Sequence, residues 1–265
     1  MVLRYILSIV GIVIISVSAS GYAQQKVGDF NLSNFRGDGT KDWEMRGKEA
    51  FVFDEYVDVN QMQARHYRQD RIIDIKADKG MLYKPQMDAY LRENVEIHSD
   101  DGAALYTDSL TWKKDKNLIY TDDPVRLARN SLEIEARGMN ADTEMETVDF
   151  AEDVTLTSQD EETGDMITVQ CQGPLEVDYN RGVAVFKDQV RVESERGLMF
   201  SDKATVYFNA DQQNIMRIIA EGNVKIVQGE NITLADKATY VNAEQRLVLE
   251  GTPHLIIFPD ETTGN

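Results

Sequence analysis

Hydrophobic and polar residues alternate with a period of about two through most of the chain after residue 90. This alternation is typical of strands with one buried face and one solvated face. Turn signals such as Asp101-Gly102 and Arg196-Gly197 separate the alternating segments, and no long segment has a helical period. The pattern predicts short antiparallel strands and argues against βαβ units, whereas Asn60–Asp70 fits a helix or a strand. The segments are Val95/Ile97, Leu132/Ile134, Val154/Leu156, Leu175/Val177/Tyr179, Val190/Val192, Val224/Ile226, Ile232/Leu234, Leu247/Leu249 and Leu255/Ile257.

The strand pattern also repeats. Triplets of the form Val-x-(Ile/Leu/Val) recur at intervals of 30, 29, 36 and 34 residues, and intervals of this size indicate stacked supersecondary units. Each unit alone leaves one apolar sheet face uncovered, so the faces must be buried between two opposed sheets. We therefore expect an all-β fold, an elongated, jellyroll-like or solenoid sandwich with open ends. The triplets begin at Val95, Val125, Val154, Val190 and Val224.

A second motif recurs within the repeat, in which a small residue and Asp precede a strand segment that ends in an aromatic side chain. It occurs around Asp78, Asp108, Asp202 and Asp236. A recurring carboxylate is compatible with metal binding or acid-base chemistry, but catalysis rarely needs four equivalent sites along one stack. We therefore expect each Asp to face water or to fix a turn.

The alternation predicts which side chains face the space between the sheets, because successive strand residues point to opposite sides. These inward residues either line an apolar, lipid-binding trough or fill a closed core. The residues predicted to point inward are Ile97, Leu156, Val192, Ile226 and Leu249. The neighbours predicted to point outward are Glu96, Thr155, Arg191, Lys225 and Val248.

Charge and composition narrow the functional classes. The 265 residues include 46 Asp and Glu against 28 Lys and Arg, a net charge of −18, so we expect no nucleic-acid partner. The single Cys171 excludes an internal disulfide, and its place in a strand beside Val169 predicts a small buried hydrophobe rather than a nucleophile. Neither zinc-ligand spacing nor a phosphate-binding glycine loop occurs. We predict no catalytic residue, metal or cofactor.

Residues 1–23 resemble a secretory signal, with Arg4 before the apolar run Tyr5–Val17 and small residues up to Ala23. The run is as long as the core of a signal peptide and shorter than the roughly 20 residues of a membrane span. The segment is either a cleaved signal peptide or a retained N-terminal membrane anchor. Both place the rest of the chain outside the cytoplasm.

Ordered motifs run from Phe30–Phe35 and Trp43–Ala50 through Ile75–Gly80 and Thr107–Trp112 to Ala136–Met139. This series resembles LptC, the periplasmic component of the lipopolysaccharide export transporter, over about residues 27–158. The later segments are similar to the related OstA/LptA repeat. They are Ala220–Ile226, Ala235–Tyr240 and Leu247–Pro253.

The resemblance implies an LptC-like β-jellyroll domain at 27–158 and an OstA/LptA-like domain at 159–260, with a tail at 261–265, as one continuous jellyroll or two consecutive modules. It implies a non-enzymatic periplasmic protein that binds lipopolysaccharide acyl chains in an apolar trough. The lipid would pass from the inner-membrane ABC transporter toward the outer membrane through a bridge protein of the LptA type.

An open jellyroll also leaves strand edges that pair with other chains. We expect an N-terminal edge near Trp43–Phe53 to meet the transporter. The strand expected to dock onto the bridge protein consists of His254, Leu255, Ile256, Ile257 and Phe258.

Other functional classes remain open from the sequence. A secreted β-solenoid adhesin, or an enzyme acting on polysaccharide through paired carboxylates, fits the same pattern. A structural envelope scaffold that carries no lipid also fits.

Overall fold

The computed structural model describes residues 25–67, 72–86, 88–142, 146–159, 164, 166–195, 197–209, 214–244 and 246–257. Within these ranges the chain forms 17 strands and two short 3-10 helices, η1 (Lys114–Lys116) and η2 (Asn242–Glu244). The all-β prediction is confirmed, and the ambiguous stretch after Asn60 is strand as far as Tyr67. The predicted signal or anchor at 1–23 and the tail at 261–265 lie outside the described residues. No helix in the described ranges has the length and apolar composition of a membrane span.

The strands form two compact units. The N-terminal unit contains the described residues up to Asn130 together with Arg137–Val148, and the C-terminal unit contains Ser131–Ala136 and the described residues from Asp149 onward. Strands β8 (Leu132–Asp142) and β9 (Thr147–Gln159) contribute to both. The domain boundary expected between residues 158 and 159 stays a prediction.

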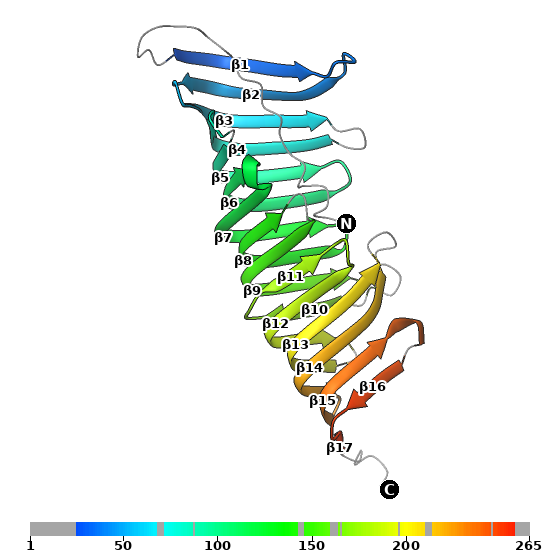
Figure 1. The fold of residues 1–265 in the computed structure, drawn as a ribbon. Helices are drawn as coiled ribbons and strands as arrows, with labels where there is room; N and C mark the ends of the chain where they lie inside the picture. Colours follow the sequence, from blue (N-terminus) through cyan, green and yellow to red (C-terminus); the bar gives the residue numbers. More distant parts are fainter. Residues whose placement is uncertain are drawn as a thin grey trace. The chain divides into compact units, whose positions relative to one another are not determined.

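In the N-terminal unit each strand pairs antiparallel with the next one along the chain (Figure 1). The strands are β1 (Gln25–Phe35), β2 (Lys41–Val52), β3 (Tyr56–Tyr67), β4 (Ile72–Tyr83), β5 (Asp88–Ser99), β6 (Ala103–Lys113) and β7 (Leu118–Arg129).

The C-terminal unit has the same antiparallel order, except that β10 and β11 share their neighbours β9 and β12 and that β16 and β17 both pair with β15. Its strands after β9 are β10 (Met166–Cys171), β11 (Leu175–Asp178), β12 (Val183–Ser194), β13 (Gly197–Asn209), β14 (Asn214–Gln228), β15 (Asn231–Val241), β16 (Arg246–Glu250) and β17 (His254–Ile256).

Several of the long strands are interrupted near the middle by a bulge that bends them. In β5 the pairing shifts between Arg92 and Val95, and the intervening Glu93 and Asn94 have left-handed φ values of 63° and 54°. An extra residue of this kind bends a strand and increases its twist. Equivalent shifts occur in β12 and β14. The two arms of each bent strand thereby enclose an interior space.

The bulge gives a physical reason for the sequence repeat. In four of the five triplets the valine directly follows a residue with left-handed φ, and the valine is between 1% and 3% exposed at all five positions. Each repeat therefore places a valine in the core at the same point of its strand. In the C-terminal unit this core includes Ala220, Val224, Ala235 and Ala238.

Candidate functional site

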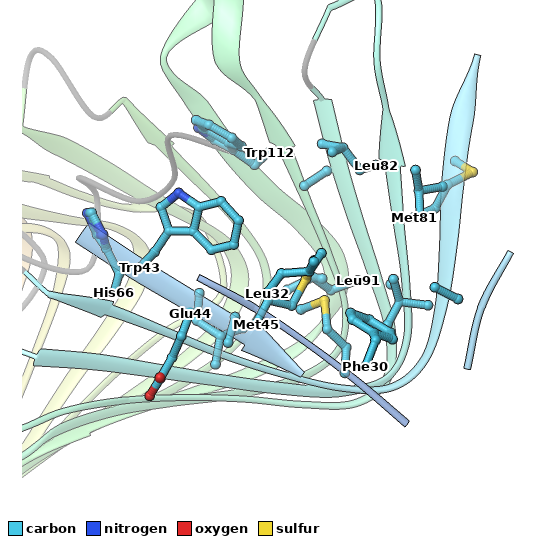
Figure 2. Close-up of a pocket in the computed structure, with 18 of the residues that line it drawn as sticks. Phe30, Leu32, Trp43, Glu44, Met45, His66, Met81, Leu82, Leu91 and Trp112 are labelled. Atoms are coloured by element: carbon cyan, nitrogen blue, oxygen red, sulfur yellow. The ribbon is translucent and has the colours of Figure 1, made fainter. Parts of the chain in front are cut away.

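The N-terminal unit encloses a cavity of about 230 Å³ inside the bend of its strands. Figure 2 shows the ribbons curving sharply around the side chains that line it. The lining is predominantly apolar and comes from β1 to β7. Its residues are Gln25, Val27, Phe30, Leu32, Trp43, Glu44, Met45, Ala50, Val52, Val57, Val59, Met62, Ala64, Arg65, His66, Ile75, Gly80, Met81, Leu82, Lys84, Ala89, Leu91, Ile97, Leu110, Trp112 and Ile119.

Strand register arranges much of this lining in rows that run across the strands. On one arm, directly paired residues form a row of Met45, Ala64, Ile75 and Ile97. On the other arm, one row holds Ala50, Val59, Gly80, Leu91 and Leu110. The next row on that arm holds Val52, Val57, Leu82, Ala89, Trp112 and Ile119. Because paired residues in adjacent strands point to the same side, each row presents a continuous apolar surface to the cavity.

Gly80 shows how closely the lining packs. A Cβ at this position would lie 2.6 Å from the Met62 sulfur. The absence of a side chain at Gly80 therefore makes space for the Met62 side chain. By contrast Ala64 and Ala89 line the cavity while remaining half-buried, so space lies in front of them. The interior is therefore well packed at the bend and open in front of these two alanines.

The charged residues among the lining have their own partners. Arg65 makes two hydrogen bonds to the Asp74 carboxylate, at 2.6 and 2.9 Å. Lys84 donates to the carbonyl of Phe53. The Glu44 carboxylate points away from the other labelled side chains in Figure 2. A hydrogen bond from Lys41, with a further one from Tyr67, lowers the pKa of Glu44.

Trp43 has a buried polar group at the cavity. It pairs with His66 and lies one row beyond Met45 toward the end of its arm. The side chain is 7% exposed, and its Nε1 has no hydrogen-bond partner. Trp43 thus brings an unpaired N–H donor to a predominantly apolar lining.

One of the predicted lipid-binding residues, Ile97, lines this cavity and is 1% exposed. The other four, Leu156, Val192, Ile226 and Leu249, belong to the C-terminal unit and are half-buried. Ile226 and Leu249 pack against the core cluster there. Among their predicted outward neighbours, Lys225 and Val248 are exposed, while Glu96, Thr155 and Arg191 are half-buried.

Most of the lining was missed from the sequence, including Phe30, Trp43 and Met45. Short alternating pairs do occur in that region, at Val57/Val59 and Ile73/Ile75. Those pairs were the available signal for strands before residue 90.

The predicted docking strand lies at an edge. His254, Leu255 and Ile256 form β17, which pairs with β15 and has all three side chains exposed. Ile257 follows and is 65% exposed. Phe258 lies outside the described residues.

The predicted N-terminal edge near Trp43–Phe53 is wrong. That segment contains β2, which pairs with β1 on one side and β3 on the other, so its backbone groups are already used. Figure 1 shows β1 as the outermost strand of the N-terminal unit, paired with β2, and its Val27 and Phe35 side chains are exposed.

Cys171 is buried, as expected for a small hydrophobe, and its thiol donates to the Gly173 carbonyl at 3.3 Å. Burial raises the pKa of this thiol, which opposes formation of the nucleophilic thiolate. No group of three or more His, Cys, Asp or Glu side chains in the described part of the chain is placed to hold a metal ion.

Comparison with protein families gives two matches in tandem. Residues 19–160 match the LptC-related lipopolysaccharide-assembly family, and residues 173–264 match the family of LptA and LptD N-terminal lipopolysaccharide transport proteins. No curated protein matches the chain.

One solved structure that matches is LptH from Pseudomonas aeruginosa, the LptA-homologous periplasmic component of the lipopolysaccharide transport device. It is 13% identical, and the match covers 72% of this chain and 98% of that one. Its TM-score of 0.22 is too low for inference from the superposition.

Proposed function

The chain belongs to the LptC-related lipopolysaccharide-assembly family, and we propose that its N-terminal unit holds lipopolysaccharide acyl chains in the cavity enclosed by β1 to β7. Its two family matches give the chain a role in lipopolysaccharide export. The main support for this proposal is the set of apolar rows that face one interior space. The charged side chains among the lining are hydrogen-bonded to other protein groups.

Transfer of an acyl chain from water to an apolar lining is favourable in free energy. Each methylene removed from water contributes about 0.8 kcal/mol, so apolar rows can bind a hydrocarbon chain without a catalytic group. The sugars and phosphates of the lipid remain in water, where their hydration is kept. This division matches the apolar interior and strongly acidic overall charge of the chain.

The size of the cavity sets a limit on what it holds in this conformation. Its volume of about 230 Å³ exceeds the roughly 150 Å³ of an apolar cavity that binds benzene. That is room for part of one acyl chain and not for a complete lipid. We therefore infer that the two arms of the N-terminal unit separate when the lipid enters.

Family membership also supports proposals about place and partners. The chain would act in the periplasm, released after signal cleavage or tethered to the inner membrane by residues 1–23. The exposed backbone edge of β1 would receive the inner-membrane ABC transporter, and the edge formed by β17 would receive a bridge protein of the LptA type. Strand addition at such edges supplies main-chain hydrogen bonds.

Native mass spectrometry of the full chain, purified from its own envelope, tests lipid carriage. We expect a bound species containing lipid A on the wild-type protein. Ala64→Phe fills the space in front of a lining alanine and should strongly reduce the bound fraction. Ala104→Phe is the matched control, because Ala104 lies between the buried Ala103 and Leu105 and does not line the cavity. Absence of lipid from the wild type, or equal loading of both variants, would overturn the proposal.

A further inference from the structure

The Trp43 indole N–H is a buried donor without a hydrogen-bond partner, on a residue whose cross-strand neighbour is His66 (Figure 2). Trp43 is the one lining residue with both a side chain at most 7% exposed and a ring nitrogen that has no hydrogen-bond partner in the described residues. In Figure 2 the nitrogen lies on the edge of the ring away from Leu32 and Met45. The donor is thus at the end of the apolar rows rather than among them.

A buried donor without a partner is costly, because it has lost its hydrogen bonds to water and gained none. The penalty for such a group is about 1–3 kcal/mol, and most buried tryptophan N–H groups in proteins have an acceptor. A ligand that brings an acceptor to this position removes the penalty. The position therefore favours ligands with an oxygen at a defined distance from their hydrocarbon part.

We propose that the Trp43 N–H binds the carbonyl oxygen of the ester or amide that joins an acyl chain to its sugar. This inference rests on the proposed function, since it assumes that the chain occupies the apolar rows. With hydrocarbon along the Met45 row, the carbonyl that begins the chain reaches Trp43 one row further out. Trp43 then fixes how deeply the chain inserts.

A neutral carbonyl fits this position better than a phosphate. Desolvating an anion costs several kcal/mol unless a cation pairs with it. The cationic side chains of the lining already have partners: Arg65 donates to the Asp74 carboxylate, and Lys84 donates to the Phe53 carbonyl. The carbonyl needs only the single donor that Trp43 offers.

Two lipids that differ only in the acceptor test the proposal. The probes are monopalmitoyl glycerol, which has an ester carbonyl, and hexadecyl glycerol, in which an ether methylene replaces it. Binding is measured for the full chain, for Trp43→Phe and for Trp112→Phe. Trp112 also lines the cavity, on the opposite arm, and its nitrogen is not among the buried groups without a partner.

We expect the wild type and Trp112→Phe to bind the ester about tenfold more tightly than the ether. Trp43→Phe should bind the two lipids equally. Equal affinities in the wild type, or a preference that survives in Trp43→Phe, overturn the role of Trp43 while leaving lipid carriage intact. Failure of the wild type to bind either lipid overturns the proposed function together with this inference.

A spectroscopic measurement avoids dependence on the folding of the Trp43 variant. The chain has two tryptophans, so a nitrogen-15 spectrum contains two indole N–H signals, and Trp112→Phe assigns them. The Trp43 proton signal should move downfield with the ester and stay in place with the ether. An identical response to both lipids contradicts hydrogen bonding to the carbonyl.

Discussion

Asn94 donates a hydrogen bond to Asp78 on the neighbouring strand, with its Nδ2 2.6 Å from the carboxylate Oδ2. The C-terminal unit repeats this relationship, where Asn223 donates to Asp202 at 2.9 Å. Both asparagines have left-handed backbone, with φ values of 54° and 48°. Two of the recurring aspartates therefore tie the bend of the next strand, which is the turn-fixing role expected from the sequence rather than metal binding.

The bend at Asn94 should depend on both the hydrogen bond and the backbone conformation. Asn94→Ala loses the bond and places an ordinary residue in the left-handed region, which we expect to cost about 2 kcal/mol of unfolding free energy. Asn94→Gly loses the bond but adopts this backbone easily. It should be about 1 kcal/mol more stable than the alanine variant in urea unfolding. Equal stabilities would contradict a backbone contribution.

Gly222 should tolerate no side chain. Its φ is +77°, and a Cβ there would lie 2.3 Å from the Asp202 carboxylate. Gly229 is a matched control, because its φ is +59° and no atom lies within 4 Å of its Cβ position. We expect Gly229→Ala to cost about 1 kcal/mol and Gly222→Ala at least about 2 kcal/mol in unfolding free energy. Similar costs at the two positions would mean that the bend relaxes around the added methyl group.

The bends also explain why the sequence predicted strands after residue 90 and an apolar trough but missed most of the residues that line the cavity. Val59 and Met62 are both buried although they are three positions apart, an odd spacing, because Gln61 adopts a left-handed φ of 52° and shifts the alternation. A fixed period of two therefore fails across the bend. After residue 90 the alternating pairs lie within single arms, and there the pattern correctly predicted strands.

The cavity itself depends on non-local register. Met45 and Ala64 become neighbours only through the pairing of β2 with β3, which a single sequence does not specify. The wrong N-terminal edge has a similar origin. The alternation before residue 90 did not show which strand is outermost, and Asn34 of β1 pairs with Trp43.

Removal of the exposed strand β17 tests whether this strand binds the bridge protein. Truncation after Pro253 removes β17, whose three side chains are all exposed, so thermal unfolding should change little. The truncated chain should lose association with an LptA-type bridge protein in a pull-down experiment. Truncation after Ile257 is the control and should retain association. Retained association after loss of β17 would exclude this docking edge.

The single thiol offers a pH-dependent test of burial. Burial raises the pKa of Cys171 above its ordinary value of 9.0, so the folded state holds the proton more strongly than the unfolded state. This contribution to stability is complete below pH 9.0 and is lost as the pH rises through the higher folded pKa. As the pH rises above 9.0, the free energy of unfolding should therefore fall more for the wild type than for Cys171→Ala. A constant difference would contradict a buried thiol.

Site-specific photo-crosslinking in cells tests lipid carriage most directly. Met45 lines the cavity and is half-buried, whereas its neighbour Arg46 is exposed and does not line it, so the two positions sample opposite faces of β2. A benzophenone amino acid at Met45 should form an adduct with lipopolysaccharide, and the same group at Arg46 should not. Equal labelling at both positions, or no labelling at either in a folded protein, would contradict transport of acyl chains through the cavity.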